Sequence, residues 1–401
     1  MAVTGPITGF NTTDLNTSVT QDLGSRYISK DYLLDVYPNI ASQLGARTSP
    51  GLWSWGYNAY GQLGLLNTVK QSSPVQVGSL TNWKQIATGS AHTLAVKTDG
   101  TLWSWGNNIT GQLGLADRVH RSSPVQVGSL TNWKQVAGGV SHTVAIKTDG
   151  TLWSWGQNAG GALGLGDLPN RSSPVQVGLL TNWKQVTGGA FHTLAIKTDG
   201  TLWSWGANTN SQLGLLDVAH RSSPVQVGSL TNWKLVAAGA YYTAAIKTDG
   251  TLWSWGYNNN GQLGLLDIVH RSSPVQVGSL TSWKLVACGS YHTAAIKTDG
   301  TLWSWGRNTY SQLGLLDIVN RSSPVQVGSL TNWKQVAGGT LHTVAIKTDG
   351  TLWSWGYNIY GQLGLLDIVD RSSPVQVGSL TSWKQVATGD YYIAVIADGS
   401  F

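Results

Sequence analysis

Residues 133–182 read WKQVAGGVSHTVAIKTDGTLWSWGQNAGGALGLGDLPNRSSPVQVGLLTN, and this fifty-residue unit decides the fold. Its central string, Leu-Trp-Ser-Trp-Gly, begins at Leu52 and returns every fifty residues up to Leu352. A third tryptophan recurs with the same spacing from Trp83 to Trp383, so seven copies contain all 21 tryptophans. A period of about fifty residues is typical of a four-stranded blade, which predicts a propeller or a solenoid.

The unit contains four expected strands, designated A (133–137), B (142–147), C (152–155) and D (174–177). Asp-Gly at 149–150 is typical of a tight hairpin turn between strands B and C, and the proline of strand D suits an outer edge. The array begins at strand C and ends at strand B (392–396). We therefore predict an all-β, seven-bladed propeller of four-stranded blades, closed by strands from both ends of the array, because a ring has few exposed edges.

Composition excludes several other classes of protein. Of 401 residues only 11% are charged, glutamate is absent and the net charge is +6. Low charge with abundant aromatic residues argues against disorder, and no apolar run is long enough to predict a membrane span. The first residues lack the charged and apolar segments of a secretion signal. Lysines recur once or twice in each repeat, so the positive charge is spread evenly, which favours solubility over nucleic-acid binding.

Two motifs carry a family resemblance. WGYNAYGQLG (Trp55–Gly64) and VAGGVSHTVAI (Val136–Ile146) resemble the two signatures of RCC1-type repeats, and the similarity covers residues 51–400. The resemblance implies a seven-bladed propeller whose A strands line a central channel. The founding member is a nucleotide exchange factor that also binds chromatin, an activity associated with an inserted β-wedge and a basic N-terminal tail. The constant period leaves no room for an insertion, and residues 1–24 carry no basic cluster, so exchange activity is not expected.

Several repeated residues have a structural and a functional interpretation. Trp53 and Trp55 point to one sheet face, where packing between blades is favoured over a stacking platform for sugars or bases. Five histidines on strand B are expected to be buried and to satisfy backbone groups, with metal binding as the alternative: His92, His142, His192, His292 and His342. Asp117 and Arg121 are expected to stabilise their own loop. Without a nucleophile elbow or a phosphate-binding loop, we predict no enzyme, no metal and no cofactor.

The seven copies differ mainly in two loops. These are the A–B loop, at Ser90-Ala91 and its equivalents, and the C–D loop, at Tyr57 and Tyr60 and their equivalents. In an antiparallel blade these two connections emerge on the same side, so the variable loops are expected to share one face. Its tyrosine and asparagine content is typical of a paratope, although neutral drift in exposed loops is an alternative. The predicted binding residues are Tyr57, Tyr60, Asn107, Tyr241, Tyr257, Asn260, Tyr291, Arg307, Tyr310, Tyr357, Tyr360 and Tyr391.

Residues 1–48 are predicted to form an N-terminal arm and docking segment ahead of the propeller (49–401). Ser29 can cap a short helix that ends before Pro38. The residues expected to anchor the arm are Tyr27, Tyr32, Leu33, Val36 and Tyr37. The run YISKDYLLDVYP (27–38) also resembles RCC1-repeat structural proteins of tailed bacteriophages.

Three functional hypotheses follow. The first is a non-enzymatic virion protein of a phage tail, baseplate or capsid surface. Its arm would bind other virion subunits, and its variable face would contact a host-surface protein, a glycan or a neighbouring subunit. No nucleic acid and no membrane insertion are expected. The second is a free protein-interaction propeller that acts as an inhibitor or scaffold. The third is a carbohydrate-binding propeller that uses Tyr57, Tyr257, Tyr310 and Tyr357.

Overall fold

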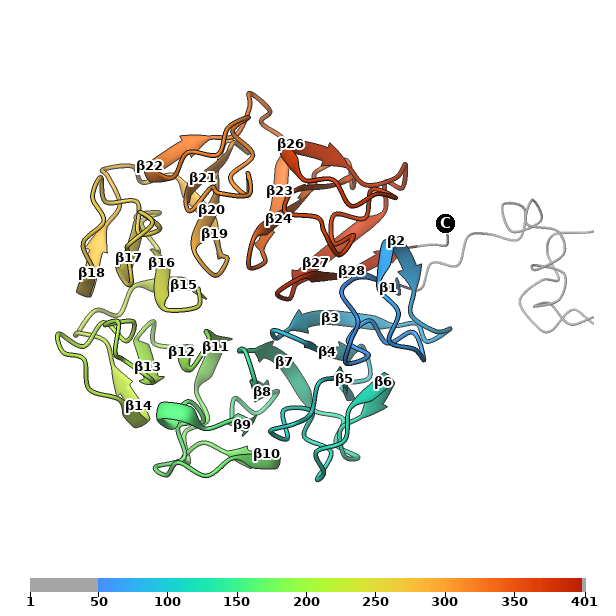
Figure 1. Cartoon of the computed structure of the whole chain (residues 1–401). Coiled ribbons are helices and arrows are strands. Elements are labelled where there is room, and N and C mark those ends of the chain that lie inside the picture. The colour runs from blue at the N-terminus through green and yellow to red at the C-terminus, as the bar shows by residue number, and fades with distance from the viewer. Residues whose placement is uncertain (1–49, 399–401) are drawn as a thin grey trace, which may run out of the picture. The chain divides into compact units, whose positions relative to one another are not determined.

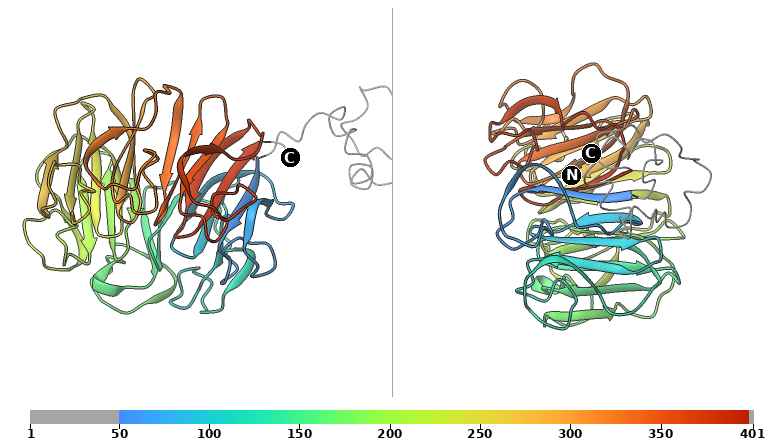
Figure 2. Two further views of the ribbon diagram at one scale, coloured as in Figure 1. Left: turned by 45° about the horizontal axis from the view of Figure 1, so that its top comes forward. Right: turned by 90° about the vertical axis from the view of Figure 1, so that its right-hand side faces the viewer.

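The computed structural model describes residues 50–398, which form a closed ring of seven antiparallel four-stranded sheets (Figure 1). Figure 2 shows that the loops gather at the two ends of the strands. The seven-bladed propeller predicted from the repeat is confirmed. In chain order the blades are blade 1 (β3–β6), blade 2 (β7–β10), blade 3 (β11–β14), blade 4 (β15–β18), blade 5 (β19–β22), blade 6 (β23–β26) and blade 7 (β27, β28, β1 and β2).

Each blade has one strand of each kind, and equivalent strands have nearly the same bounds. The A strands line the axis: β3 (Trp83–Thr88), β7 (Trp133–Gly138), β11 (Trp183–Gly188), β15 (Trp233–Ala238), β19 (Trp283–Cys288), β23 (Trp333–Gly338) and β27 (Trp383–Thr388). The B strands are β4 (His92–Lys97), β8 (His142–Lys147), β12 (His192–Lys197), β16 (Tyr242–Lys247), β20 (His292–Lys297), β24 (His342–Lys347) and β28 (Tyr392–Asp398).

The C strands follow the B–C turn: β5 (Leu102–Gly106), β9 (Leu152–Gly156), β13 (Leu202–Gly206), β17 (Leu252–Gly256), β21 (Leu302–Gly306), β25 (Leu352–Gly356) and β1 (Pro50–Gly56). The D strands form the outer edge: β6 (Arg121–Gln126), β10 (Arg171–Gln176), β14 (Arg221–Gln226), β18 (Arg271–Gln276), β22 (Arg321–Gln326), β26 (Arg371–Gln376) and β2 (Gln71–Gln76). One short 3₁₀ turn, η3 (Ala159–Gly161), lies in a C–D loop.

Blade 7 closes the ring with strands from both ends of the array, as predicted. Its sheet order is β2-β1-β28-β27, and β1 pairs with β28 from Pro50 opposite Asp398 to Gly56 opposite Tyr392. Backbone hydrogen bonds therefore join the first and last strands. After this closure the edge strands of each sheet are the inner A strand, at the axis, and the outer D strand.

The core lies between blades and explains the tryptophan repeat. In blade 1, Trp83 contacts Trp103 and Trp105 at ring-centroid distances of 6.1 and 6.2 Å. This face packs against Leu52 and Ile396 of blade 7 in one buried cluster, and the same pattern recurs around the ring. In six of the described blades the second tryptophan of strand C also donates its indole N–H to a carbonyl of the preceding blade, as Trp155 does to Gln112 at 3.0 Å. Packing between blades, the favoured interpretation of the tryptophans, is what the structure shows.

The Lys-Thr-Asp-Gly-Thr turn, which recurs in blades 1–6, is stabilised by contacts of its own side chains. Asp149 accepts hydrogen bonds from the backbone N–H and the hydroxyl of Thr151, and Thr151 in turn accepts from the indole of Trp153. The Lys147 ammonium lies 3.6 Å from the centroid of the Trp153 ring, which is a cation–π contact. The side chains of Lys147, Asp149 and Thr151 are thus committed to the same cluster, so substitutions of these three residues would disturb the packing of the blade.

The D strands differ from the sequence prediction. Strand D was expected at 174–177, but β10 begins earlier, at Arg171, and ends at Gln176. Its register against β9 shifts between Arg171 and Val175, because Pro174 lies in this stretch and has no N–H to donate. The Val177 N–H still bonds to the Leu152 carbonyl at 2.8 Å, so the ladder resumes beyond the proline.

Two glycines allow the effect of crowding to be distinguished from that of backbone strain: Gly139, in the A–B loop of blade 2, and Gly128, in the connection from blade 1 to blade 2. A Cβ on Gly139 would lie 2.1 Å from Cε1 of His142 and 2.6 Å from the Gly189 carbonyl oxygen. Gly128 has open space around it but a φ of +59°. We expect Gly139→Ala to reduce the free energy of unfolding by about 3 kcal/mol through overpacking, and Gly128→Ala by only about 1 kcal/mol through backbone strain. Equal losses in chemical denaturation of the two variants would contradict this assignment.

Candidate binding face and axial channel

The A–B and C–D loops lie on the same face of the ring. Tyr360, from the C–D loop of blade 6, packs against Tyr391, from the A–B loop of blade 7, with ring centroids 5.2 Å apart. The Tyr57 N–H, at the start of the C–D loop of blade 7, donates to the Tyr391 carbonyl at 2.9 Å. The loop face expected from the strand connections therefore exists, and its side chains touch one another.

Neighbouring tyrosines on this face form a continuous row. Tyr57 contacts Tyr360 at 5.0 Å, and Tyr357 contacts both Tyr391 at 6.2 Å and Tyr310 at 4.8 Å. These rings are half-buried, apart from Tyr310, which is just over one-third exposed. Tilted and edge-on ring contacts of this kind are the arrangement that aromatic pairs prefer.

Arg307 extends the row across blade 5. Its guanidinium carbon lies 5.8 Å from the ring centroids of both Tyr291 and Tyr310. Tyr257 then contacts Tyr291 at 6.3 Å and Tyr241 at 6.4 Å. Together these residues make one surface across blades 4–7, which we call the tyrosine arc: Tyr57, Tyr360, Tyr391, Tyr357, Tyr310, Arg307, Tyr291, Tyr257 and Tyr241.

Three of the twelve predicted binding residues lie apart from the arc. Tyr60 packs against His120 of blade 1 at 5.3 Å. The side-chain oxygen of Asn107 accepts hydrogen bonds within its own loop, from the Ile109 N–H and the Gln112 amide. The backbone N–H of Asn260 bonds to Gln262, also within one loop. Loop position alone therefore did not distinguish contact residues from residues that only shape the loop.

Sequence reasoning also missed two histidines. His270 packs against Tyr257 at 4.8 Å, and His120 packs against Tyr60 while its Nδ1 accepts the Asn108 N–H. A signal existed, because this position also varies among the repeats, as Lys, His, Asn and Asp.

Burial favours the protonated hydroxyl in three tyrosines of the arc. Desolvation raises the pKa of Tyr291, Tyr357 and Tyr391, and neighbouring tyrosines and Asp390 add to the shift for Tyr391. Neutral phenols can donate and accept hydrogen bonds at physiological pH. The arc therefore offers rigid aromatic area together with hydroxyl groups along one side of the ring.

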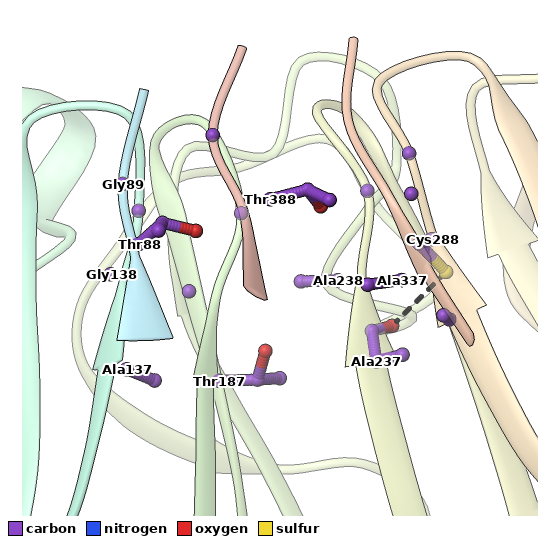
Figure 3. Close-up of a pocket in the computed structure, with 18 of the residues that line it drawn as sticks. Thr88, Gly89, Ala137, Gly138, Thr187, Ala237, Ala238, Cys288, Ala337 and Thr388 are labelled. Atoms are coloured by element: carbon purple, nitrogen blue, oxygen red, sulfur yellow. Dashed lines mark hydrogen bonds between the residues drawn. The ribbon is translucent and has the colours of Figure 1, made fainter. Parts of the chain in front are cut away.

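The A strands enclose an axial channel with a volume of about 450 Å³ (Figure 3). Its walls are neutral residues such as Thr88, Ala137, Thr187 and Thr388, drawn from several blades. Glutamine side chains connect neighbouring A strands. The Gln85 amide donates to the Val136 carbonyl and accepts the Val136 N–H. The resemblance implied that strand A lines a central channel, and the structure shows this arrangement.

The strand B histidines are buried between blades. Nε2 of His142 lies 3.1 Å from the Thr193 hydroxyl of the next blade, and His92 and His292 make the same contact. The partner is thus a side chain rather than the backbone group that we expected. Tyr242 and Tyr392, at equivalent positions, do bond to the backbone of the next blade. Among residues 50–398, no three His, Cys or Asp side chains gather closely enough to hold a metal ion.

The repeated Asp-Arg pair stabilises its own loop, as expected. Arg121 forms an ion pair with Asp117, whose carboxylate also accepts the Val119 N–H and the Asn108 amide. Equivalent pairs recur in five further loops. These groups satisfy one another, so they do not form a catalytic pair of unlike carboxylates. Among the described strands and turns, no helix is long and apolar enough to cross a membrane.

Seven four-stranded blades around an axial channel, closed by strands from both ends of the array, define a seven-bladed β-propeller. A model of the RCC1-like domain matches residues 42–286, and the model of the regulator of chromosome condensation (RCC1) repeat matches residues 299–346 and 349–396. The chain belongs to this RCC1-like family. No significant match exists among curated proteins.

Solved structures share the fold at low sequence identity. Human WBSCR16 is similar with a TM-score of 0.80 and 22% identity, over 88% of this chain and 100% of that chain. Yeast RCC1 (Prp20), solved bound to Kap60, is similar with a TM-score of 0.80 and 22% identity, over 88% and 90%. Prp20p from Saccharomyces cerevisiae, described with its binding to Gsp1p and histones, gives 0.78 and 22%, over 88% and 92%. At this identity the likeness establishes the fold.

The buried histidines predict a steep loss of stability in acid. Burial lowers the pKa of His92, His192 and His342 from 6.5 to about 3, and that of His142 and His292 to about 4. Below pH 6.5 the unfolded chain therefore binds more protons than the folded chain. The free energy of unfolding should be highest above pH 6.5 and should decrease as the pH falls toward 4. Five histidines together give a slope of up to about 7 kcal/mol per pH unit.

The measurement is the thermal unfolding midpoint, followed by tryptophan fluorescence from pH 7.5 to 4.5. As a matched control, the five histidines are replaced by tyrosine, the residue that the chain itself uses at Tyr242 and Tyr392. This variant should lose most of the slope between pH 6.5 and 4.5. The single change His142→Tyr should lower the proton uptake on unfolding by about one. An unchanged slope in both variants would show that other groups cause the acid sensitivity.

Proposed function

We propose that this protein is a non-enzymatic binding protein that contacts a partner macromolecule through the tyrosine arc. The observation that carries the proposal is the continuity of the arc. Eight tyrosines and Arg307, from four blades and from residues 57 to 391, form one chain of ring contacts. Tyrosine supplies large, rigid contact area with a polar end at low entropic cost, which is why binding loops are enriched in it.

The distribution of the aromatic residues also favours binding over drift. Position 57 and its equivalents carry Tyr in blades 4, 6 and 7 and Arg in blade 5, but Asn107, Gln157 and Ala207 in blades 1–3. Tyr or Arg thus occupies this position in four adjacent blades, a distribution that favours a shared contact surface over independent drift. The Lys-Thr-Asp-Gly-Thr turns on the opposite face are constant because their side chains hold the tryptophan cluster, as the contact of Lys147 with Trp153 shows. The difference in variability between the two faces therefore does not support binding.

A protein partner is the occupant that the family favours. The yeast relatives are described as bound to Kap60 and as binding Gsp1p and histones, so propellers of this fold do bind proteins. Exchange activity is not proposed for this chain. Each described blade has four strands, and the β-wedge associated with that activity has no counterpart within residues 50–398.

We place this binding protein on a phage particle, anchored by residues 1–48. The support is the resemblance of residues 27–38 to RCC1-repeat structural proteins of tailed bacteriophages. The anchoring residues Tyr27, Tyr32, Leu33, Val36 and Tyr37 lie outside the described residues, so the arm, its predicted helix and the boundary at 48 remain predictions. In this proposal the arm binds virion subunits and the arc meets a host-surface protein.

Site-specific photo-crosslinking tests the binding face. In the full-length chain, Ile359→p-benzoylphenylalanine places a crosslinker beside Tyr360 in a side chain that is 45% exposed. Thr348→p-benzoylphenylalanine places it in an exposed turn on the opposite face. Incubated with the envelope fraction of host cells, position 359 should give discrete crosslinked proteins, and position 348 should give none above background.

The double change Tyr310→Ala and Tyr357→Ala tests whether the crosslinks from position 359 depend on the tyrosine arc. Both rings belong to the arc and are partly exposed, so folding should be unaffected, and crosslinking from position 359 should fall at least tenfold. Crosslinks that survive this change, or that appear equally at position 348, would contradict the proposal. Binding of the intact chain to glycans alone would instead favour the carbohydrate hypothesis.

Removal of the arm tests the placement on a particle. A chain lacking residues 1–48 should keep the tryptophan fluorescence and the unfolding transition of the propeller, yet be absent from purified phage particles that contain the full-length chain. Incorporation of the shortened chain would exclude anchoring by the arm. A folded chain that joins no particle in either form, but captures one soluble partner, would favour the free interaction protein.

A further inference from the structure

The mouth of the axial channel on the loop face is chemically divided. It is formed by the first residue of the variable pair in each A–B loop: Ser90, Val140, Ala190, Ala240, Ser290, Thr340 and Asp390. The four members from blades 5, 6, 7 and 1 are polar, and the three from blades 2–4 are apolar. Because the ring places blades 3 and 4 opposite blade 7, Asp390 faces an apolar wall across the channel.

The polar half is organised around one carboxylate. The Ser90 and Thr340 hydroxyls, one from each neighbouring blade, both donate to Asp390, and the Ser290 hydroxyl donates to Thr340 at 3.0 Å. Backbone bonds support the same arrangement, since the Asp390 N–H donates to the Ser90 carbonyl at 3.1 Å. The carboxylate is thus held in a fixed position at the rim rather than extending freely into solvent.

Asp390 is also the single acidic or basic residue among the described residues that line the channel. The other lining residues are Gly, Ala, Val, Ser, Thr, Gln and Cys288. No described lysine, arginine or histidine forms an ion pair with Asp390. A fixed carboxylate without a counter-charge, beside a neutral cavity, attracts a cationic group.

This carboxylate adjoins the tyrosine arc. Asp390 is followed directly by Tyr391, whose ring contacts Tyr357 and Tyr360. A partner lying on the arc therefore passes the channel mouth. The aromatic rings at this point can add cation–π attraction to the charge of the carboxylate.

We propose that the channel mouth accepts one lysine or arginine side chain from the protein that the arc binds. The cationic head meets Asp390, and the methylene stem lies against Val140 and Ala240 on the apolar wall. Long basic side chains combine an apolar stem with a charged tip, which matches the divided mouth. The inference rests on the proposed function and adds to it the chemistry of the partner, namely a basic residue presented at the contact surface.

The same observations disfavour other occupants. A divalent cation needs several oxygen ligands, and the mouth offers one carboxylate whose oxygens already accept two hydroxyl hydrogen bonds. An anionic group would be repelled by Asp390. A wholly apolar group would leave the carboxylate desolvated without a partner, which is unfavourable.

The test uses the full-length chain and three small probes. These are Nα-acetyl-lysine amide, Nα-acetyl-arginine amide and the neutral isostere Nα-acetyl-norleucine amide, with binding measured by saturation-transfer NMR at low salt. We expect the lysine and arginine probes to bind at least tenfold more tightly than norleucine. Asp390→Asn keeps the size and the acceptor oxygen of the side chain, and it should abolish this preference.

Asp370→Asn is the matched control, because it removes one carboxylate from the same face without changing local bonding. Asp370 accepts the Asn358 N–H, and Asn170 and Asn320 make the same bond at equivalent positions. This variant should retain the full lysine preference. Loss of the preference in Asp370→Asn to the same degree would reduce the effect to general surface charge and overturn the proposal.

The remaining outcomes are equally decisive. No preference for lysine over norleucine in the unmodified chain, or a preference that survives Asp390→Asn, overturns the inference. Tighter binding of glucosamine than of the lysine probe would assign the mouth to an amino sugar and also overturn it. If Asp390→Asn leaves crosslinking from position 359 intact while the arc substitutions abolish it, the binding face stands and only the basic residue is excluded.

Discussion

The structure depends on one interface, the packing of a tryptophan face of each blade against an aliphatic face of the blade before it. Trp83 and Trp105 bury their rings against Leu52 and Ile396, and the equivalent contacts recur between each pair of neighbouring blades. Aromatic side chains bury large areas, so this interface supplies most of the apolar burial. A single blade cannot bury either of its faces, and the ring is therefore the smallest unit in which the core is complete.

The same interface restricts where the sequence can vary. The strands carry the interface, the histidines pack between blades, and the Lys-Thr-Asp-Gly-Thr turn holds the tryptophan cluster through Thr151 and Lys147. The A–B and C–D loops remain, and there the copies differ. Because both loops emerge on one face, differences that are scattered through 335 residues of sequence, from 57 to 391, are collected on one surface. A repeated scaffold can carry an asymmetric contact surface in this way.

Much of the fold could be predicted because it follows from periodicity. The blade number, the closure by β1 and β28 and the role of the tryptophans follow from spacing and residue type. The start of strand D could not be predicted, because Arg171 lies beyond the register shift and pairs with Gly156 only in the folded blade. The histidine partners were predicted incorrectly for a related reason: Thr193 is 51 residues from His142 and meets it only because successive blades stack.

The sequence by itself determined the architecture, the buried positions and the face on which the repeats diverge, because these properties repeat with the period of the chain. Only the tertiary structure decided which variable residues touch. It separated the tyrosine arc from Tyr60, Asn107 and Asn260, brought His270 against Tyr257, and set Asp390 between Ser90 and Thr340. The physical reason is that the ring joins residues 300 positions apart, so side chains that form one surface have no relation along the chain.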